Sequence, residues 1–206
     1  MIYIPKHFHE QDTARLHALI RAQNFGTLIS NGTAGIEVSH LPFLLDGGRN
    51  VLRAHMARGN PQWKSLQSGA EVVAVFHGPH HYVSPSWYVN HPSVPTWNYA
   101  VVHVTGKPRL IEDSGQLEAM VRDLVDNHEA ISPVPWRMDL PVDYREKMLA
   151  GIVGFEIDIT GLEGKFKLSQ NRPAADRPLV ADTLEQIGND NARGIAALMR
   201  ENASRG

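Results

Sequence analysis

The chain has 206 residues, of which 42% are hydrophobic and 20% are charged, and its formal net charge is −2 at pH 7. These values are typical of a globular domain with its own core, and they exclude a disordered chain. Cysteine is absent, which excludes disulfides, thiolate catalysis and cysteine-bound metals. The charge balance lacks the basic excess with which proteins neutralise nucleic-acid phosphates, so it weighs against a nucleic-acid-binding domain.

The sequence also carries no signal for a membrane or for secretion. No apolar run approaches the roughly 18 residues that a membrane-spanning helix needs. Residues 1–6 lack the basic start and the long apolar stretch of a secretory signal. We therefore expect a cytoplasmic protein with no membrane contact.

The first part of the chain predicts one short helix and then several short strands. Asp12 is placed to cap a helix whose apolar face carries Leu16, Leu19 and Ile20 at helical spacing. Strand-like segments then alternate with turn signals. The segments are 25–30, 35–45, 50–56 and 71–77, and the turn signals are Asn31-Gly32, Asp46-Gly47-Gly48 and Gly78-Pro79.

The second part contains the clearest helix of the chain. Apolar residues from Leu117 to Val125 recur at i, i+3, i+4, i+7 and i+8, which predicts a helix over 114–128. The other expected elements are an irregular segment 82–96, strands over 97–105 and 107–111 joined by a turn at Gly106, a short helix with Tyr144, Met148 and Ile152, strands over 155–160 and 164–169, and a weakly helical tail.

Many short strands with a few interrupting helices predict a mainly β protein, an antiparallel barrel with peripheral helices. Regular strand–helix alternation is absent, and so are the glycine-rich loops of the doubly wound and P-loop folds. We expect a barrel domain with inserted helices over 1–177 and a peripheral helical tail over 178–206.

The first cluster of candidate site residues lies between His55 and Lys64, directly after an expected strand. Arg58 and Lys64 supply cations, and the Asn60 amide can donate hydrogen bonds. Because arginine offers a two-pronged donor, this loop is a candidate cradle for a phosphate monoester. A solvated turn with a structural arginine is the alternative, since irregular turns of this composition are common.

The second cluster lies between Gly78 and Tyr88 and combines aromatic and hydroxyl groups. Trp87, with the hydroxyls of Ser84 and Ser86, could form one wall of a pocket for a flat ring. The neighbouring histidines also allow a metal site or structural histidines as interpretations. Gly78-Pro79 breaks any helix that would align the histidines, and no carboxylate lies nearby in sequence, which disfavours a metal.

The third cluster, Thr96, Trp97, Asn98 and Tyr99, begins an expected strand. These residues could pack against the ring of a ligand and form hydrogen bonds at its edge. The alternative is that they belong to the core of the barrel. Strand alternation places Trp97 and Tyr99 on one face and Asn98 on the other.

The fourth cluster is basic and rich in amides, and a proline ends it. Its members could meet an anionic ligand or could form a solvated strand end. Together the four clusters fit an aromatic ligand that carries a phosphate. The residues of this last cluster are Lys167, Ser169, Gln170, Asn171 and Arg172.

At these clusters the chain resembles the PaiB-like family, described as FMN-binding negative transcriptional regulators with the split-barrel fold of pyridoxamine phosphate oxidases. The similar stretches run in order over most of the chain. They are Met1–Phe8, Phe25–Leu28, His40–Asp46, His55–Trp63, Tyr82–Tyr88, Pro95–Tyr99 and Lys167–Pro173.

The resemblance implies a six-stranded split barrel and a homodimer with FMN between its subunits. By analogy with the oxidases, Arg58, Asn60 and Lys64 would hold the phosphate, with His55 nearby. The remaining residues of the four clusters, Ser84, Ser86, Trp87, Thr96, Trp97, Asn98, Lys167, Ser169, Gln170, Asn171 and Arg172, would approach the ring or the ribityl chain.

Two functions stay open at this point, with a third behind them. The family name implies a repressor that uses or senses flavin, although the 114–128 helix is not basic and no helix-turn-helix is evident. Residues 165–177 are the one candidate DNA patch, and a protein partner is the other route to regulation. A flavin-dependent oxidoreductase of a small substrate is the alternative. Haem binding is a lesser one, with axial candidates His77, His80 and His81.

Overall fold

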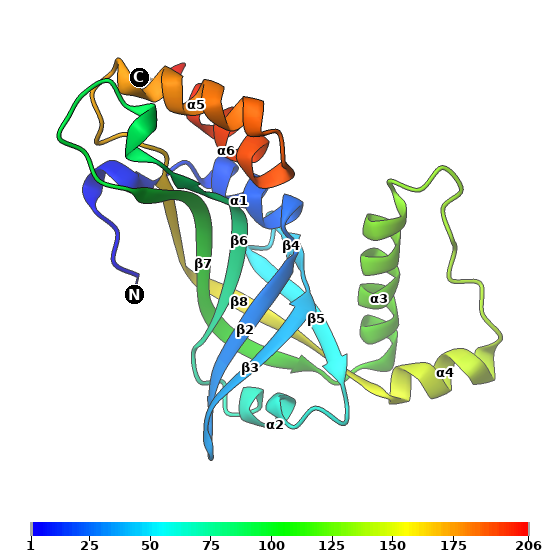
Figure 1. Cartoon of the computed structure of the whole chain (residues 1–206). Helices are drawn as coiled ribbons and strands as arrows, with labels where there is room; N and C mark the ends of the chain where they lie inside the picture. Colours follow the sequence, from blue (N-terminus) through cyan, green and yellow to red (C-terminus); the bar gives the residue numbers. More distant parts are fainter. Residues whose placement is uncertain (1, 206) are drawn as a thin grey trace. The chain divides into compact units, whose positions relative to one another are not determined.

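The computed structural model describes residues 2–205 (Figure 1). Eight strands lie in one sheet that does not close, and the fold is mainly β with helices, as the sequence predicts, although with more strands than the expected six. The strands are β1 (His9–Glu10), β2 (Phe25–Gly32), β3 (Gly35–Pro42), β4 (Leu44–Asp46), β5 (Val51–Ala57), β6 (Val72–Val83), β7 (Thr96–Ile111) and β8 (Ile152–Lys167). The helices are α1 (Thr13–Ala22), α2 (Gln62–Leu66), α3 (Ser114–Glu129), α4 (Val142–Ala150), α5 (Asp176–Ile187) and α6 (Asp190–Ala203), with 3-10 turns at Lys6–Phe8 and Pro85–Trp87.

The chain divides into two compact units. Unit 1 comprises residues 1–19, 77–103 and 163–206, and unit 2 comprises residues 20–76 and 104–162. The long strands β6, β7 and β8 contribute residues to both. The expected domain boundary at residue 177 stays a prediction.

Unit 2 contains most of the sheet, in the order β3-β2-β6-β7-β8-β5-β4. Its core is aromatic: the Phe43 ring packs edge-on against Phe76 and Phe155, with ring centroids 5.5 and 6.5 Å apart. All three side chains are excluded from solvent. Burial of this apolar surface is the main force that holds the unit together.

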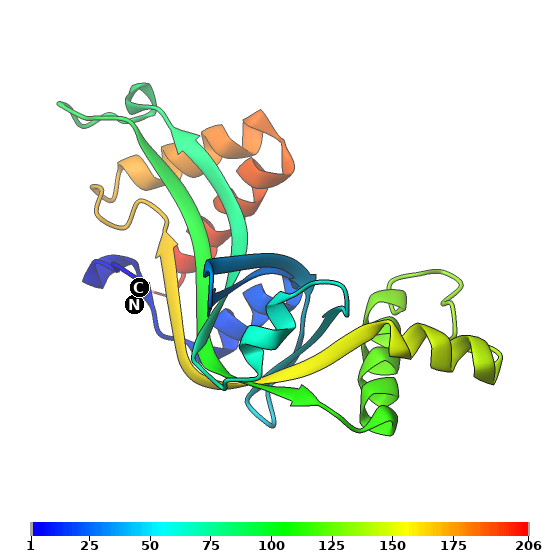
Figure 2. The same cartoon turned by 90° about the horizontal axis from the view of Figure 1, so that it is seen from below.

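Gly106 does not form the expected turn, because β7 continues through it as one strand. A Cβ atom at Gly106 would lie 2.5 Å from the carbonyl oxygen of Asp158 and 2.5 Å from Cγ2 of Ile157. The glycine therefore permits β7 to approach β8 closely, and it is needed for strand packing rather than for a change of direction. The two strands expected over 155–160 and 164–169 are likewise one strand, β8, which ends at Lys167 and so does not include 168–169 (Figure 2).

The β2–β3 hairpin is present, but its turn lies two residues further along than expected. β2 extends through Asn31 and Gly32, and residues 33–34 form the turn. Gly35 follows with φ of +124°, a conformation that favours glycine. Strand pairing across Gly32 and Gly35 thus replaces the predicted Asn-Gly turn.

The helix predicted over 114–128 is α3, which α4 joins to β8 (Figures 1 and 2). Asp113 caps its N-terminus, since its carboxylate accepts a hydrogen bond from the Gln116 amide at 2.8 Å. Leu117, Met120 and Leu124 are buried, at the predicted helical spacing. The apolar stripe of α3 therefore fastens the insertion to unit 2.

Unit 1 contains β1, the remaining parts of β6–β8 and the hairpin of α5 and α6. The tail forms two full helices rather than a weakly helical segment. Gly188, at φ of 75°, ends α5, and the Asn189 side chain caps α6. Leu184 and Ile195 are buried where the helices pack together. No helix among residues 2–205 is long and apolar enough to span a membrane.

Candidate functional site

A groove on the sheet of unit 1 gathers aromatic, histidine and lysine side chains from β6, β7 and β8. Its volume is about 630 Å³. We call it the cationic groove. The residues that line it are Ile2, Tyr3, His77, Gly78, His80, Trp97, Tyr99, Ala100, Val101, His103 and Lys165.

The alternation of β7 decides which of its side chains face this groove. Asn98 is fully buried, whereas Trp97 and Tyr99 on either side of it line the groove, as the sequence predicts. Gly78 on the neighbouring strand allows close packing, because a Cβ there would lie 3.1 Å from the carbonyl oxygen of Ala100. Alternation along β7 and the close approach at Gly78 therefore shape the groove.

Two lysines of β8 supply the positive charge of this region. The Lys165 ammonium lies 5.3 Å from the ring centroid of Tyr3 and 5.5 Å from that of Tyr99, and it donates a hydrogen bond to the Tyr3 carbonyl at 3.0 Å. The Lys167 ammonium donates to the Thr96 hydroxyl. Burial, and then repulsion from Lys165, lower the pKa of Lys167.

Trp97 is the centre of an exposed aromatic ledge. Its ring centroid lies 6.2 Å from that of His80 and 6.2 Å from that of Tyr82. The side chain is 53% exposed, so one large aromatic surface is left open to solvent. Such a surface can stack on a planar ligand.

Histidines mark another part of the same groove. Burial lowers the pKa of His103, the nearby His77 lowers it further, and Glu163 acts in the opposite direction. His103 is therefore neutral at pH 7, and one ring nitrogen can accept a hydrogen bond.

Asn98 and Ser169 form a buried polar pair beneath the groove. The Asn98 amide donates to the Ser169 hydroxyl at 2.9 Å. Both side chains are buried, and Ser169 has φ of +64°, in the left-handed region. These two predicted site residues join β7 to the end of β8.

Arg172 lies under the loop that follows β6. Its guanidinium lies 4.0 Å from the Tyr88 ring centroid and donates to the buried carboxylate of Asp176 at 3.2 Å. Asp176 also accepts hydrogen bonds from the backbone amides of Val89 and Asn90, at 3.0 and 3.2 Å. Arg172 thereby holds this loop against α5.

The other predicted residues of unit 1 are placed as follows. Gln170 bonds its own strand, since its side chain accepts from the Leu168 amide and donates to the Phe166 carbonyl. Ser84 caps the turn through the Ser86 amide at 3.2 Å. Trp87 lies beside His81, with ring centroids 6.4 Å apart, and Asn171 is exposed.

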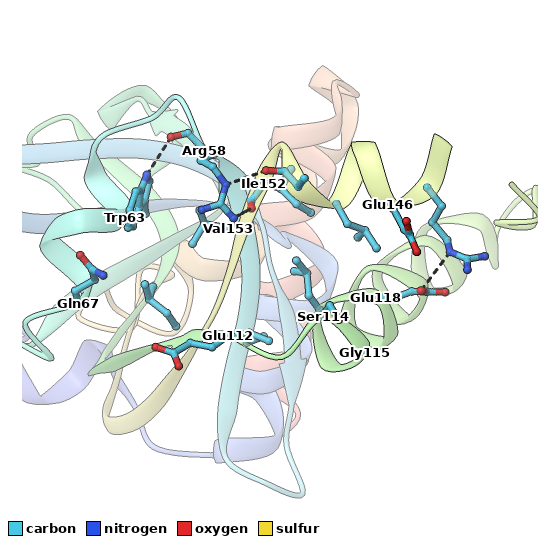
Figure 3. A pocket seen from close by; sticks show the side chains of 16 residues that line it. Arg58, Trp63, Gln67, Glu112, Ser114, Gly115, Glu118, Glu146, Ile152 and Val153 are labelled. Atoms are coloured by element: carbon cyan, nitrogen blue, oxygen red, sulfur yellow. Dashed lines mark hydrogen bonds and ion pairs between the residues drawn. The ribbon is translucent and has the colours of Figure 1, made fainter. Parts of the chain in front are cut away.

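In unit 2, Arg58 borders a second cavity, of about 730 Å³ (Figure 3). Its guanidinium donates to the carbonyl oxygens of Ala150 and Ile152, at 2.8 and 2.9 Å. Figure 3 shows this arginine at the start of β8, with Glu112 and Glu118 on other walls of the same cavity. Arg58 thus fixes the end of α4, and two of its nitrogens are occupied in doing so.

The other predicted site residues of unit 2 each lie in a different environment. Asn60 donates to the Ser39 hydroxyl at 2.8 Å. Lys64 is exposed on α2. His55 lies half-buried on β5, where burial lowers its pKa. Residues 2–205 hold no group of three or more histidine, aspartate or glutamate side chains placed to bind a metal ion.

Comparison with known sequences identifies the family. Residues 2–161 match the sequence model of the family described as "Putative FMN-binding domain". The chain belongs to this family. The resemblance inferred from the sequence is confirmed, and FMN is the cofactor of this FMN-binding protein.

Individual relatives support the same assignment. The chain is 34% identical over 204 residues to "Protease synthase and sporulation protein PAI 2" of Bacillus subtilis (strain 168), covering 97% of each chain. An uncharacterized protein of Emericella nidulans is 37% identical over 207 residues, covering 81% of this chain and 82% of that one.

Solved structures show the same fold. The flavocytochrome Anf3 from Azotobacter vinelandii matches with a TM-score of 0.64 at 16% identity, over 80% of this chain and 72% of that chain. The FAD and heme binding protein from Mycobacterium smegmatis matches with a TM-score of 0.62 at 15% identity, over 78% and 73%. The split-barrel fold expected for this FMN-binding protein is therefore present.

The cationic groove fits the chemistry of FMN. A flavin needs a surface for its flat ring, which Trp97 and Tyr99 offer, and a cation for its phosphate, which Lys165 offers. Lys165 and His103 are not among the site residues predicted from the sequence. Alternation could have found them, because Lys165 precedes Lys167 by two residues and His103 follows Tyr99 by four.

Proposed function

We propose that this protein binds FMN in the cationic groove and acts through the bound flavin as a regulator of gene expression. The observation that carries the proposal is the Lys165 ammonium, held between two tyrosine rings on a face that also presents Trp97. In this arrangement Lys165 and Lys167 neutralise the phosphate, while Trp97 and Tyr99 pack against the ring. Bound FMN supplies one- and two-electron chemistry.

Titration of the apo-protein with FMN tests the site, with quenching of flavin fluorescence as the readout. We expect saturable binding at one flavin per subunit, weakened about tenfold or more in Lys165→Met and in Trp97→Ala. Lys107→Met, on an exposed part of β7 in unit 2, is the matched control and should bind as the parent does. Parent-like affinity in both groove variants would contradict the site.

Regulation is supported by the family resemblance and by the name of the Bacillus subtilis relative, which refers to protease synthesis and sporulation. Helix α3 carries both acidic and basic side chains and is therefore not a basic recognition helix. Regulation through a protein partner fits this helix better than direct binding to DNA. Deleting the gene and measuring transcript levels, with Lys165→Met as the complementing variant, would test the role. Unchanged transcripts on deletion would contradict it.

A flavin-dependent oxidoreductase is the second candidate function. His103 and His77 favour it, because a neutral histidine in the groove can hold or deliver a proton beside a reducible ring. Anaerobic mixing with NADPH or NADH, followed by flavin absorbance, tests this activity. Haem binding through His77, His80 or His81 would instead give a sharp Soret band after hemin is added.

We also propose that the protein is a homodimer. The outer face of the β2–β3 hairpin supports this, because Phe25, Ile36 and Val38 lie on one face of it and are 68%, 77% and 54% exposed. Apolar side chains gathered on one sheet face are typical of a protein interface. Val38→Glu should shift the mass in solution from dimer to monomer, and a dimer unchanged by it would exclude this face.

A further inference from the structure

A second cavity of unit 1 lies between α5, α6 and the chain that follows β8. Its volume is about 450 Å³, within the usual range of small-molecule sites. All its lining residues lie beyond residue 161, where the match to the FMN-binding family ends. They are Leu168, Gln170, Ala174, Arg177, Pro178, Ala181, Asp182, Met199, Arg200, Asn202 and Ala203.

The interior of this cavity, which we call the tail cavity, is apolar. Leu168 and Met199 form large apolar walls and are buried. Three alanines line the cavity, of which Ala181 is buried and Ala174 and Ala203 are exposed, and their small side chains leave space for a ligand. An empty apolar space costs packing energy, and an apolar ligand that fills it recovers that energy.

One arginine is fixed at the wall of the tail cavity. Arg177 donates through Nε to the carbonyl oxygen of Arg172 and through Nη2 to that of Gln170, both at 2.9 Å. These bonds hold the guanidinium in place, and within the described residues its Nη1 donates no hydrogen bond. A fixed guanidinium with a free donor is a preorganised anion ligand.

The other charged side chains at the tail cavity pair with one another, and within the described residues Arg177 forms no ion pair. Arg200 is neutralised by Asp182 at 3.1 Å and by Glu185 at 2.8 Å. Both carboxylates are therefore bound to Arg200, and neither is paired with Arg177. Because Arg200 and Asp182 satisfy each other, Arg177 is the remaining site for an anion of single charge.

We propose that the tail cavity binds a small apolar monocarboxylate, with its carboxylate on Arg177 and its apolar part against Leu168, Ala181 and Met199. The site is separate from the cationic groove, with which it shares no lining residue. It gives the tail, which the FMN-binding match does not include, a function of its own.

Calorimetric titration of the full chain with 4-phenylbutyrate tests this site, with the uncharged 4-phenylbutanol as the matched ligand. We expect saturable binding of the carboxylate and at least about tenfold weaker binding of the alcohol. Ala203→Leu should fill the cavity and weaken 4-phenylbutyrate binding about tenfold or more. Ala197→Leu, an exposed alanine on the same helix outside the cavity, is the matched control and should bind as the parent does.

Two further variants separate this site from the flavin site. Arg177→Gln should weaken the carboxylate and leave the alcohol unchanged, and thermal unfolding checks that the variant folds. Lys165→Met should leave 4-phenylbutyrate binding unchanged while FMN binding weakens. Equal binding of acid and alcohol, parent-like binding in Ala203→Leu, or loss of carboxylate binding in Lys165→Met would each overturn the proposal.

Discussion

The Lys167 ammonium donates a hydrogen bond to the Thr96 hydroxyl, which ties the last residue of β8 to the first residue of β7. This bond fixes a partly buried cation at Thr96, the residue that precedes Trp97 of the cationic groove. Burial, and then repulsion from Lys165, lower the pKa of Lys167.

Thr96→Val should weaken FMN binding without unfolding the chain. Valine keeps the shape of threonine but removes the acceptor that positions Lys167. A hydrogen bond to a charged group contributes about 1.5–3 kcal/mol, and because the lysine itself remains, only part of this is lost from FMN binding. We expect the dissociation constant for FMN to rise about two- to tenfold in fluorescence titration. Thr33→Val, in the exposed β2–β3 turn, is the control. Tighter or unchanged binding in Thr96→Val would remove Lys167 from the site.

Arg58→Ala tests the alternative phosphate anchor in unit 2. If the sequence-based prediction is correct, the variant should bind FMN at least about tenfold more weakly, because a charge-assisted donor is lost. The bonds of Arg58 to the carbonyls of Ala150 and Ile152 also predict a lower melting temperature. A lower melting temperature with parent-like FMN affinity would leave Arg58 with a structural role alone.

Gly106→Ala should destabilise the sheet. The new methyl group would meet the Asp158 carbonyl oxygen at 2.5 Å, and backbone cannot move aside as a flexible side chain does. Overpacking of this kind costs about 1–3 kcal/mol, measured as the loss in free energy of unfolding by urea. Gly48→Ala is the control, since its nearest neighbour would be a flexible Asp46 oxygen at 3.6 Å. Equal stability of the two variants would contradict close packing of β7 on β8.

His55 should make the stability of the fold depend on pH. Burial lowers its pKa in the folded state, so the unfolded chain binds the proton first as pH falls. Its contribution is complete above the unfolded pKa of about 6.5 and decreases as pH falls below that value towards the folded pKa. Urea unfolding of the parent and of His55→Gln between pH 8 and pH 5 would measure this. The decrease should be smaller in the variant, and identical profiles would show that His55 does not contribute.

Asp176→Asn should loosen the loop that follows β6. The carboxylate accepts from Val89, Asn90 and Arg172, and an amide in its place turns one acceptor into a donor that faces other donors. We expect a lower melting temperature and faster amide exchange at Val89 and Asn90. Asp190→Asn, in the exposed first turn of α6, is the control. Unchanged exchange at both amides would show that the loop is held by other contacts.

Several features of this protein follow from the sequence alone. Helical spacing from Leu117 to Val125 predicts α3, because a helix repeats its face every 3.6 residues whatever surrounds it. Alternation along β7 places Trp97 and Tyr99 together and Asn98 opposite, for the same local reason. The order of the stretches similar to the PaiB-like family also identifies the family, which the sequence comparison confirms.

Tertiary structure decides the rest, because pairing between distant segments has no local signal. A glycine such as Gly106 predicts a turn, because glycine is common in turns. In the structure Gly106 lies within a continuous strand, where the close approach of the Asp158 carbonyl leaves no room for a side chain. Gln170 and Arg172 have the composition of an anion site, but their donors are used by backbone carbonyls and by Asp176. Local sequence patterns decide which residue types are present and which face of a helix or strand they share. Only the fold decided which of them keep a free hydrogen-bonding group, because that depends on partners from other parts of the chain.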